Sequence, residues 1–221
     1  MGLNFKKRII TSIFLISLLV LMFFYSYIMI ISVIVISIIA WIEFYALISK
    51  IFKKNKTKHE FLRFFCKAIS LFYLSGLVYL IFVIESDHLN LKIYFLYSVL
   101  VAVMSDIGGL VFGKIFKGKK LTKISPNKTI SGSLGSIVFT ILTLAGFVFI
   151  FTKNFSYIIL FVAITTSIAC QLGDLFFSLL KRKAKIKDTG NFFPGHGGVL
   201  DRLDSIFLGL PVGFTSIFLF Y

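Results

Sequence analysis

Long apolar runs alternate with short charged segments along almost the whole chain. One helical crossing of a membrane takes about 20 residues, so the uninterrupted stretch at residues 9–48 must contain two crossings. Tyr25, Ser26 and Tyr27 place aromatic and small polar residues inside that stretch, and we expect a tight turn there at interface depth. The pattern predicts an all-α polytopic membrane protein with about seven transmembrane helices. The expected spans are residues 9–24, 28–48, 68–84, 93–116, 134–151, 155–180 and 206–221.

The composition agrees with this pattern. The chain has 221 residues, of which 58% are hydrophobic, and a soluble domain of this length would not need so much apolar surface. We expect one integral membrane domain over residues 1–221. Residues 9–104 would form an amino-terminal scaffold, and residues 105–221 would form the catalytic part. The first apolar run has no small-residue cleavage site after it, so we expect it to be a span and not a signal peptide.

The distribution of basic residues predicts orientation. A net charge of +15 could indicate a nucleic-acid partner, but the basic residues lie in short clusters between apolar runs, as the positive-inside rule describes. If the amino terminus is cytoplasmic, every Lys and Arg except Lys92 and Lys153 falls on the cytoplasmic side. We therefore expect a bacterial inner (cell) membrane protein with the lipid bilayer, and no nucleic acid, as its partner.

The segment at residues 171–205 is densely charged although its surroundings are apolar. Charge near a membrane interior is costly and usually functional. Gln171, Asp174, Ser178 and Lys181 share one helical face, which should look into the bundle or a wet cavity. Alternatively, Asp174 only links helices by pairing with a nearby Lys. The acidic residues of the segment are Asp174, Asp188, Asp201 and Asp204.

The middle of this segment is rich in glycine. Gly190, Gly195, Gly197 and Gly198 disfavour regular helix and allow close backbone approach to phosphate oxygens, although an ordinary connecting loop would also contain glycine. His196 could transfer a proton or contact phosphate, and the sequence does not decide between them.

Carboxylates at the start of the last span could hold a cation. Asp201 and Asp204 share a face, and carboxylate oxygens suit Mg²⁺, although acids at a helix start also complement its dipole. Asp106 lies among small residues in the fourth span. It either reaches the same site or is a structural acid paired with a Lys or a hydroxyl. Glu43, within the second span, is either functional or paired with a neighbouring helix.

The order of these motifs resembles a known family. Ser178-Leu-Leu-Lys-Arg, Lys187-Asp188 and Pro194-Gly-His-Gly-Gly-Val-Leu-Asp-Arg-Leu-Asp204 are similar to the signature of phosphatidate cytidylyltransferases, also called CDP-diacylglycerol synthases. Ser105-Asp106 and Ser125-Pro-Asn-Lys-Thr129 resemble two upstream blocks of that family. Phe177 and Ser131 depart from the pattern, because the family usually has acids at or near these positions.

The resemblance implies a metal-dependent nucleotidyltransferase of phospholipid biosynthesis, in which CTP and phosphatidate give CDP-diacylglycerol and pyrophosphate. It also implies a homodimer. Its metal-binding acids match Asp174 and Asp201, which would hold Mg²⁺; Asp106 is a further candidate, and a second cation is left open. The catalytic candidates are Asp174, Lys187, Asp188, His196, Asp201 and Arg202. The substrate-binding candidates are Ser125, Asn127, Lys128, Thr129, Ser178, Lys181, Arg182, Gly197, Gly198 and Asp204.

The implied reaction explains why the site is cationic. The lipid phosphate and the triphosphate are both anions, so catalysis requires positioning and charge neutralisation, and no protein nucleophile is needed. The nearest rival is a CTP-dependent lipid or polyprenol kinase, which would release CDP. A transporter is disfavoured because the acids gather at one membrane face beside Lys and Arg. A purely structural bundle would carry fewer charges near its core.

Overall fold

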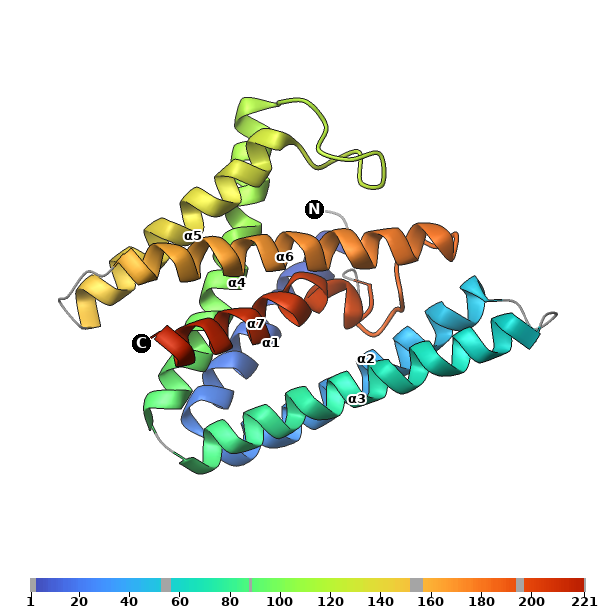
Figure 1. Ribbon diagram of the computed structural model, residues 1–221, viewed down its shortest axis with the longest axis horizontal. Helices are drawn as coiled ribbons and strands as arrows, with labels where there is room; N and C mark the ends of the chain where they lie inside the picture. The colour runs from blue at the N-terminus through green and yellow to red at the C-terminus, as the bar shows by residue number, and fades with distance from the viewer. Residues whose placement is uncertain (1–2, 53–56, 88, 152–156, 194–196, 221) are drawn as a thin grey trace. The chain divides into compact units, whose positions relative to one another are not determined.

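The computed structural model describes residues 3–52, 57–87, 89–151, 157–193 and 197–220. Within these residues the regular structure is helical (Figure 1), apart from two isolated bridges that join Lys120 to Thr129 and Phe193 to Gly197. The prediction of an all-α protein is confirmed. The helices of the described part of the chain are α1 (Leu3–Phe24), α2 (Ser26–Ile51), α3 (Thr57–Asp87), α4 (Leu89–Phe116), α5 (Ile130–Phe151), α6 (Tyr157–Lys183) and α7 (Leu200–Phe220).

Several helices are long and apolar enough to cross a membrane. Across the described residues, 4 segments meet this description: Ser26–Ile51, Lys58–Ile84, Tyr97–Phe116 and Leu160–Lys183. Shorter apolar helices cover Ile9–Phe24 and Ile130–Gly146. Large apolar side chains point outward along them; Phe72, for example, is 82% exposed, as expected for a surface solvated by lipid. The predicted number of spans stays a prediction.

The helix boundaries follow the sequence pattern at one point and depart from it at another. Tyr25 has an extended backbone (φ −123, ψ 107) between α1 and α2, so the predicted interruption of the first long apolar stretch is confirmed. α3 begins at Thr57 and not near residue 68. The difference arises because the prediction marked the start of the apolar run, whereas the helix already includes the charged turns before that run.

The chain separates into two compact units. Unit 1 is Met1–Asp87 with Leu180–Leu203, and unit 2 is His88–Leu179 with Asp204–Tyr221. The expectation of one domain, with a scaffold and a catalytic part, stays a prediction.

In unit 1, α2 packs against α3 and also contacts α1. Leu47 and Ile48 of α2 form a buried cluster with Ala184, and Ile186 packs against it. The cluster fixes the stretch that follows α6 against α2. The connection that leads to the predicted glycine-rich turn is therefore anchored at Ala184 and Ile186.

A Schellman motif ends α6. The amide of Lys185 donates to the Arg182 carbonyl (3.0 Å), and the amide of Ile186 donates to the Lys181 carbonyl (3.0 Å). Lys185 has a φ of 56°, the left-handed conformation that the motif requires and that glycine usually supplies. This sharp end turns the chain away from the helix axis, so that Ile186 reaches the apolar cluster on α2.

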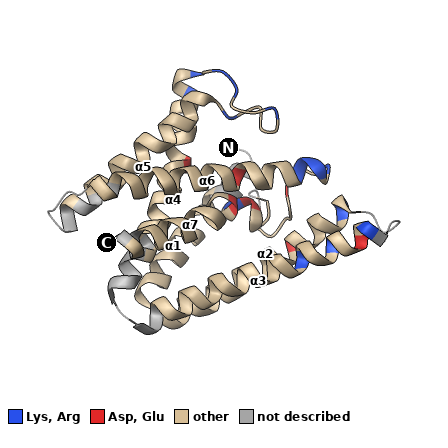
Figure 2. Cartoon of the chain, viewed as in Figure 1, with Lys and Arg blue, Asp and Glu red and all other residues tan. Residues whose placement is uncertain are grey.

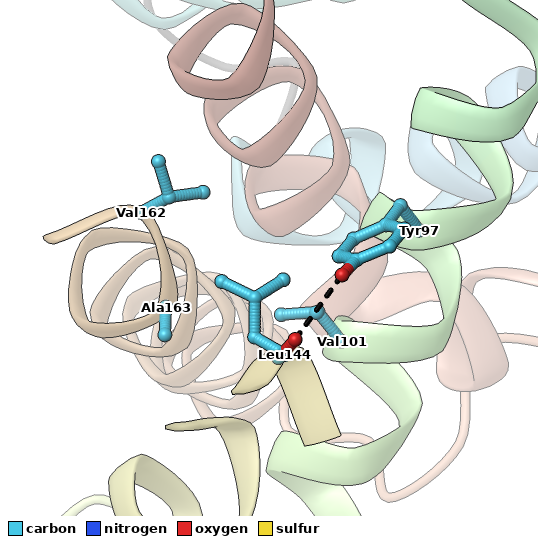
Figure 3. Packing of buried hydrophobic residues seen from close by; sticks show 5 residues of the cluster. All are labelled: Tyr97, Val101, Leu144, Val162 and Ala163. Carbon is cyan, nitrogen blue, oxygen red and sulfur yellow. Dashed lines mark hydrogen bonds between the residues drawn. The ribbon is translucent and has the colours of Figure 1, made fainter. Parts of the chain in front are cut away.

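In unit 2, α4 packs against α5. Its core joins Tyr97 and Val101 of α4 to Leu144 of α5 and to Val162 and Ala163 of α6 (Figure 3). The Tyr97 hydroxyl donates to the Leu144 carbonyl at 3.2 Å, so the one polar atom of this cluster is satisfied. The cluster thereby holds α4 and α6, which carry predicted site residues, together with α5.

Candidate functional site

Asp201, in the first turn of α7, is surrounded by hydrogen-bond donors of unit 1. We call Lys181, Thr189, Gly198 and Asp201 the Asp201 cluster. The Lys181 ammonium lies 2.8 Å from Asp201 Oδ1. The backbone amides of Thr189 and Gly198 donate to Oδ2 at 2.7 and 3.1 Å. The Asp201 side chain is only 6% exposed, so these donors replace water around a charge.

The same surroundings set the ionisation of Asp201. Burial alone would raise the pKa of the carboxyl group, but the hydrogen bonds from Lys181, Thr189 and Gly198 and the charge of Lys181 outweigh it, and the pKa lies below its ordinary value. Asp201 is therefore ionised at neutral pH. An ionised carboxylate offers the oxygen atoms that a hard cation prefers.

Glycine is required where the loop before α7 passes close to the carboxylates of Asp201 and Glu43. Gly197 has a φ of +85°, and a Cβ there would lie 3.0 Å from Asp201 Oδ2. A Cβ on Gly198 would overlap Glu43 Oε2 and Thr189 Oγ1. The stretch is non-helical at residues 186–193 and 197–199, so the predicted glycine-rich connection is confirmed there. His196, a predicted catalytic residue, lies outside the described residues.

Glu43 of α2 belongs to the same surroundings. This acid was singled out from the sequence as functional or paired with a neighbouring helix, but the sequence did not connect Glu43 with the loop. Its carboxylate accepts hydrogen bonds from the Val199 amide (3.0 Å), the Leu200 amide (2.9 Å) and the Thr189 hydroxyl (2.8 Å). That hydroxyl also lies 3.0 Å from Asp201 Oδ2. In the sequence, Glu43 stands out only as a lone acid within an apolar run. Its hydrogen-bond donors lie in the loop before α7, and the spacing of residues along a helix cannot predict them.

Asp174 of α6 has a lysine partner as well. We call Lys128, Asp174 and Ser178 the Asp174 cluster, which lies in unit 2. The Lys128 ammonium forms an ion pair with Asp174 Oδ2, and the Ser178 hydroxyl donates to Oδ1 at 3.3 Å. The structure thus brings Lys128, from one predicted motif, to Asp174 and Ser178, which were predicted to share a helical face. Pairing of Asp174 with a lysine was one of the two sequence alternatives, and it is compatible with a site role.

The Ser-Pro-Asn-Lys-Thr block places Lys128 through a turn. The Lys128 amide donates to the Ser125 carbonyl at 3.1 Å, with Pro126 at the position where a β-turn favours proline. The Thr129 hydroxyl then accepts from the Gly132 amide at 3.1 Å and so caps α5. Thr129 has a structural role here, and the substrate-binding roles predicted for Ser125, Asn127 and Thr129 stay predictions.

Asp106 is paired with a hydroxyl. The Ser205 hydroxyl donates to Asp106 Oδ2 at 2.6 Å. This agrees with the alternative that Asp106 is a structural acid paired with a hydroxyl. Gln171, the first residue of the predicted polar stripe, interacts with the hydroxyl and the carbonyl of Ser133. These bonds connect α4 to α7 and α5 to α6 by polar contacts. The metal role considered for Asp106 stays a prediction.

The other predicted residues are mostly solvent-accessible. Figure 2 shows Lys and Arg at the carboxyl end of α6 and along the connection between α4 and α5. Asp204 is half-buried and accepts the Ser205 amide at 3.0 Å. The exposed predicted residues are Asn127, Arg182, Lys187, Asp188 and Arg202.

The two departures from the family pattern have local explanations. Phe177 is buried, and its ring packs against Phe207 with centroids 5.6 Å apart. The Ser131 hydroxyl lies 3.0 Å from Thr129 Oγ1. Both positions are thus used for packing or for the start of α5.

Asp174 and Asp201 are the carboxylates that the resemblance matches to metal-binding acids. Across the described ranges, no three His, Cys, Asp or Glu side chains gather closely enough to hold an ion. Mg²⁺ typically takes one or two carboxylates and completes its shell with water and substrate phosphates. The donor chemistry of Asp174 and Asp201 fits this mode of binding.

Comparison with known proteins adds independent information. A model described as the cytidylyltransferase family matches residues 4–220. A phosphatidate cytidylyltransferase of Staphylococcus haemolyticus is 41% identical over 130 residues, which is 58% of this chain and 49% of the relative. The Staphylococcus aureus protein of the same name is 40% identical over 121 residues, 54% of this chain and 46% of that relative. The matched region thus spans about half the length of these relatives.

Proposed function

Because the chain belongs to the cytidylyltransferase family, we propose that it is a phosphatidate cytidylyltransferase that makes CDP-diacylglycerol from CTP and phosphatidate. The observation that carries the proposal is the family match over residues 4–220. We take the two substrates from the name of the relatives. The match to this chain covers about half of their length. The two ion pairs supply a physical basis for the chemistry.

In the proposed reaction, a phosphate oxygen of phosphatidate attacks the α-phosphorus of CTP. A new phosphoanhydride bond forms, the bond from the α-phosphorus to the bridging oxygen breaks, and pyrophosphate leaves with that electron pair. Both reactants are anions, so their repulsion is the main obstacle, and fixed cations reduce it. Lys128 and Lys181 are the cations that the structure places beside acids, and Arg182, Lys187 and Arg202 add exposed positive charge.

The two lysine–aspartate pairs suggest how the charged side chains of the site are stabilised when no substrate is bound. Each of Asp174 and Asp201 is neutralised by a lysine, which lowers the cost of holding a carboxylate beside apolar helices. Lys128 and Lys181 would then be available to hydrogen-bond nucleotide phosphates, and Asp174 and Asp201 would be available to hold a cation. The charge at each acid then stays balanced before and after binding.

We propose Mg²⁺ as the cation, with Asp174 and Asp201 each offering carboxylate oxygens. When bound, Mg²⁺ would withdraw negative charge from the nucleotide phosphates. Lys128 and Lys181 would do the same by hydrogen bonding, and the glycines of the turn would let its backbone come close to phosphate oxygens. His196 and Asp188 stay proposed site residues without an assigned step.

The membrane setting follows from the lipid substrate. Its acyl chains remain in the bilayer, so the enzyme must present its polar site at the membrane surface. We propose seven spans, a cytoplasmic amino terminus and a site that faces the cytoplasm, where CTP is found; the distribution of Lys and Arg supports this orientation. The homodimer implied by the resemblance is also kept as a proposal.

Incubation of the purified protein with CTP labelled at the α-phosphorus, phosphatidate and Mg²⁺ tests the function. Label should move into a lipid that co-migrates with CDP-diacylglycerol, with one pyrophosphate released per lipid. Release of CDP together with phosphorylation of a lipid would instead identify a kinase. Absence of any labelled lipid would reject the proposed function.

A further inference from the structure

Glu43 is the buried acid that the proposed reaction does not use. It is 8% exposed on α2, about two helical turns before Lys50, the basic residue of the last turn of that helix. A carboxylate at such a depth is retained only if it has partners. We infer that Glu43 is a positioning residue, which holds Thr189 and the start of α7 so that Asp201 keeps one orientation. The inference rests on the proposed function, because Asp201 is one of its acids.

The two carboxylates share one frame of donors. Three successive amides at the start of α7 are divided between them: Gly198 donates to Asp201, and Val199 and Leu200 donate to Glu43. Thr189 is divided in the same way, since its amide donates to Asp201 and its hydroxyl to Glu43. Any displacement of Glu43 must therefore move groups that orient Asp201.

Packing alone does not require an acid here. The apolar cluster of Leu47, Ile48 and Ala184 already joins α2 to the stretch that follows α6. The loop is also shaped around the carboxylate, because a Cβ on Gly190 would lie only 2.6 Å from Glu43 Oε1. Glu43 thus satisfies amides that α7 leaves without intrahelical partners, and it does so beside the proposed site acid.

The test compares Glu43→Gln, Glu43→Asp and the wild type as purified full-length proteins. Glutamine keeps the size but replaces one acceptor by a donor that faces other donors, so kcat should fall by about 10- to 100-fold, with a smaller change in KM for CTP. Aspartate keeps the charge on a shorter side chain and should recover part of kcat. Amides of residues 197–203 should exchange hydrogen about 10-fold faster in Glu43→Gln.

A double-mutant cycle with Thr189→Val tests the route of the effect. If Glu43 acts through Thr189 and the α7 amides, the combined variant should lose at least about fivefold less activity than the product of the two single losses. Multiplicative losses would overturn the inference. So would unchanged hydrogen exchange at residues 197–203 in Glu43→Gln.

Met29→Ala is the matched control. Met29 is 2% exposed on the same helix and lies far along α2 from the cluster. The substitution should lower the melting temperature but leave kcat unchanged. If kcat in Glu43→Gln and Met29→Ala falls only in proportion to lost stability, Glu43 is structural and the inference is wrong. If the wild type makes no CDP-diacylglycerol, the proposed function fails, and the exchange measurement still decides whether Glu43 holds the loop.

Discussion

At the scale of single residues, charge pairing governs the two acids of the proposed chemistry. Asp174 and Asp201 each bind a lysine, and asparagine would keep their size while removing their charge. Asp174→Asn or Asp201→Asn should lower CDP-diacylglycerol formation by about 100-fold or more and leave membrane insertion unchanged. Turnover by the purified variants measures this, with the exposed acid variant Glu60→Gln as control. Normal turnover in either variant would remove that carboxylate from the mechanism.

Steric space at Gly198 allows a second residue-scale prediction. A methyl group there would overlap the Glu43 and Thr189 side chains, so Gly198→Ala should destabilise the protein by about 1–3 kcal/mol and reduce turnover. Gly76→Ala is the control, since a Cβ at Gly76 meets nothing within 4 Å. Thermal unfolding in detergent compares the two. Equal melting temperatures would show that the loop can move away from Glu43.

Some of these residues could be predicted and others could not. Asp174, Lys181 and Asp201 stand in a segment of unusual charge, and the family resemblance added Lys128. The structure pairs Lys128 with Asp174 and Lys181 with Asp201. The partners of Glu43 are backbone amides in an irregular loop. Every residue has such amides, so no residue type marks the ones that will face an acid.

At the scale of elements, the end of α6 carries local strain. Lys185 adopts a positive φ, which costs a residue with a Cβ about 1 kcal/mol relative to glycine. Lys185→Gly should therefore raise the free energy of unfolding by about that amount, measured by thermal or denaturant unfolding of the purified protein. Lys185→Ala removes the charge but keeps the Cβ, so it should give no gain. Equal gains in both variants would attribute the effect to charge.

The helices themselves were largely predictable, because apolar runs of this length have few alternatives in a membrane. The interruption at Tyr25 was placed correctly from two tyrosines around a serine. The continuity of α3 was missed because Lys58, Arg63 and Lys67 were interpreted as a basic cytoplasmic segment that precedes the span. The Lys67 ammonium instead lies 3.0 Å from the centre of the Tyr45 ring on α2, so a charged residue is accommodated within a helical turn.

At the scale of the whole molecule, orientation is the property that the sequence predicts and that labelling can measure. Lys123 lies in the basic connection between α4 and α5, which we expect inside, and Lys92 is expected outside. In a chain with Cys66→Ala and Cys170→Ala, an impermeant maleimide should label Lys92→Cys in intact cells. Lys123→Cys should react only after permeabilisation. Labelling of Lys123→Cys in intact cells would reverse the proposed orientation.

The position of the Thr189 hydroxyl between Glu43 and Asp201 has a further consequence. A hydroxyl carries a single proton, so it can donate to only one of the two carboxylates at a time. When the hydroxyl donates to Glu43, it joins the loop to α2, and when it donates to Asp201, it adds one more donor to that carboxylate. The support of the loop and the hydrogen bonding of Asp201 therefore compete for the same proton.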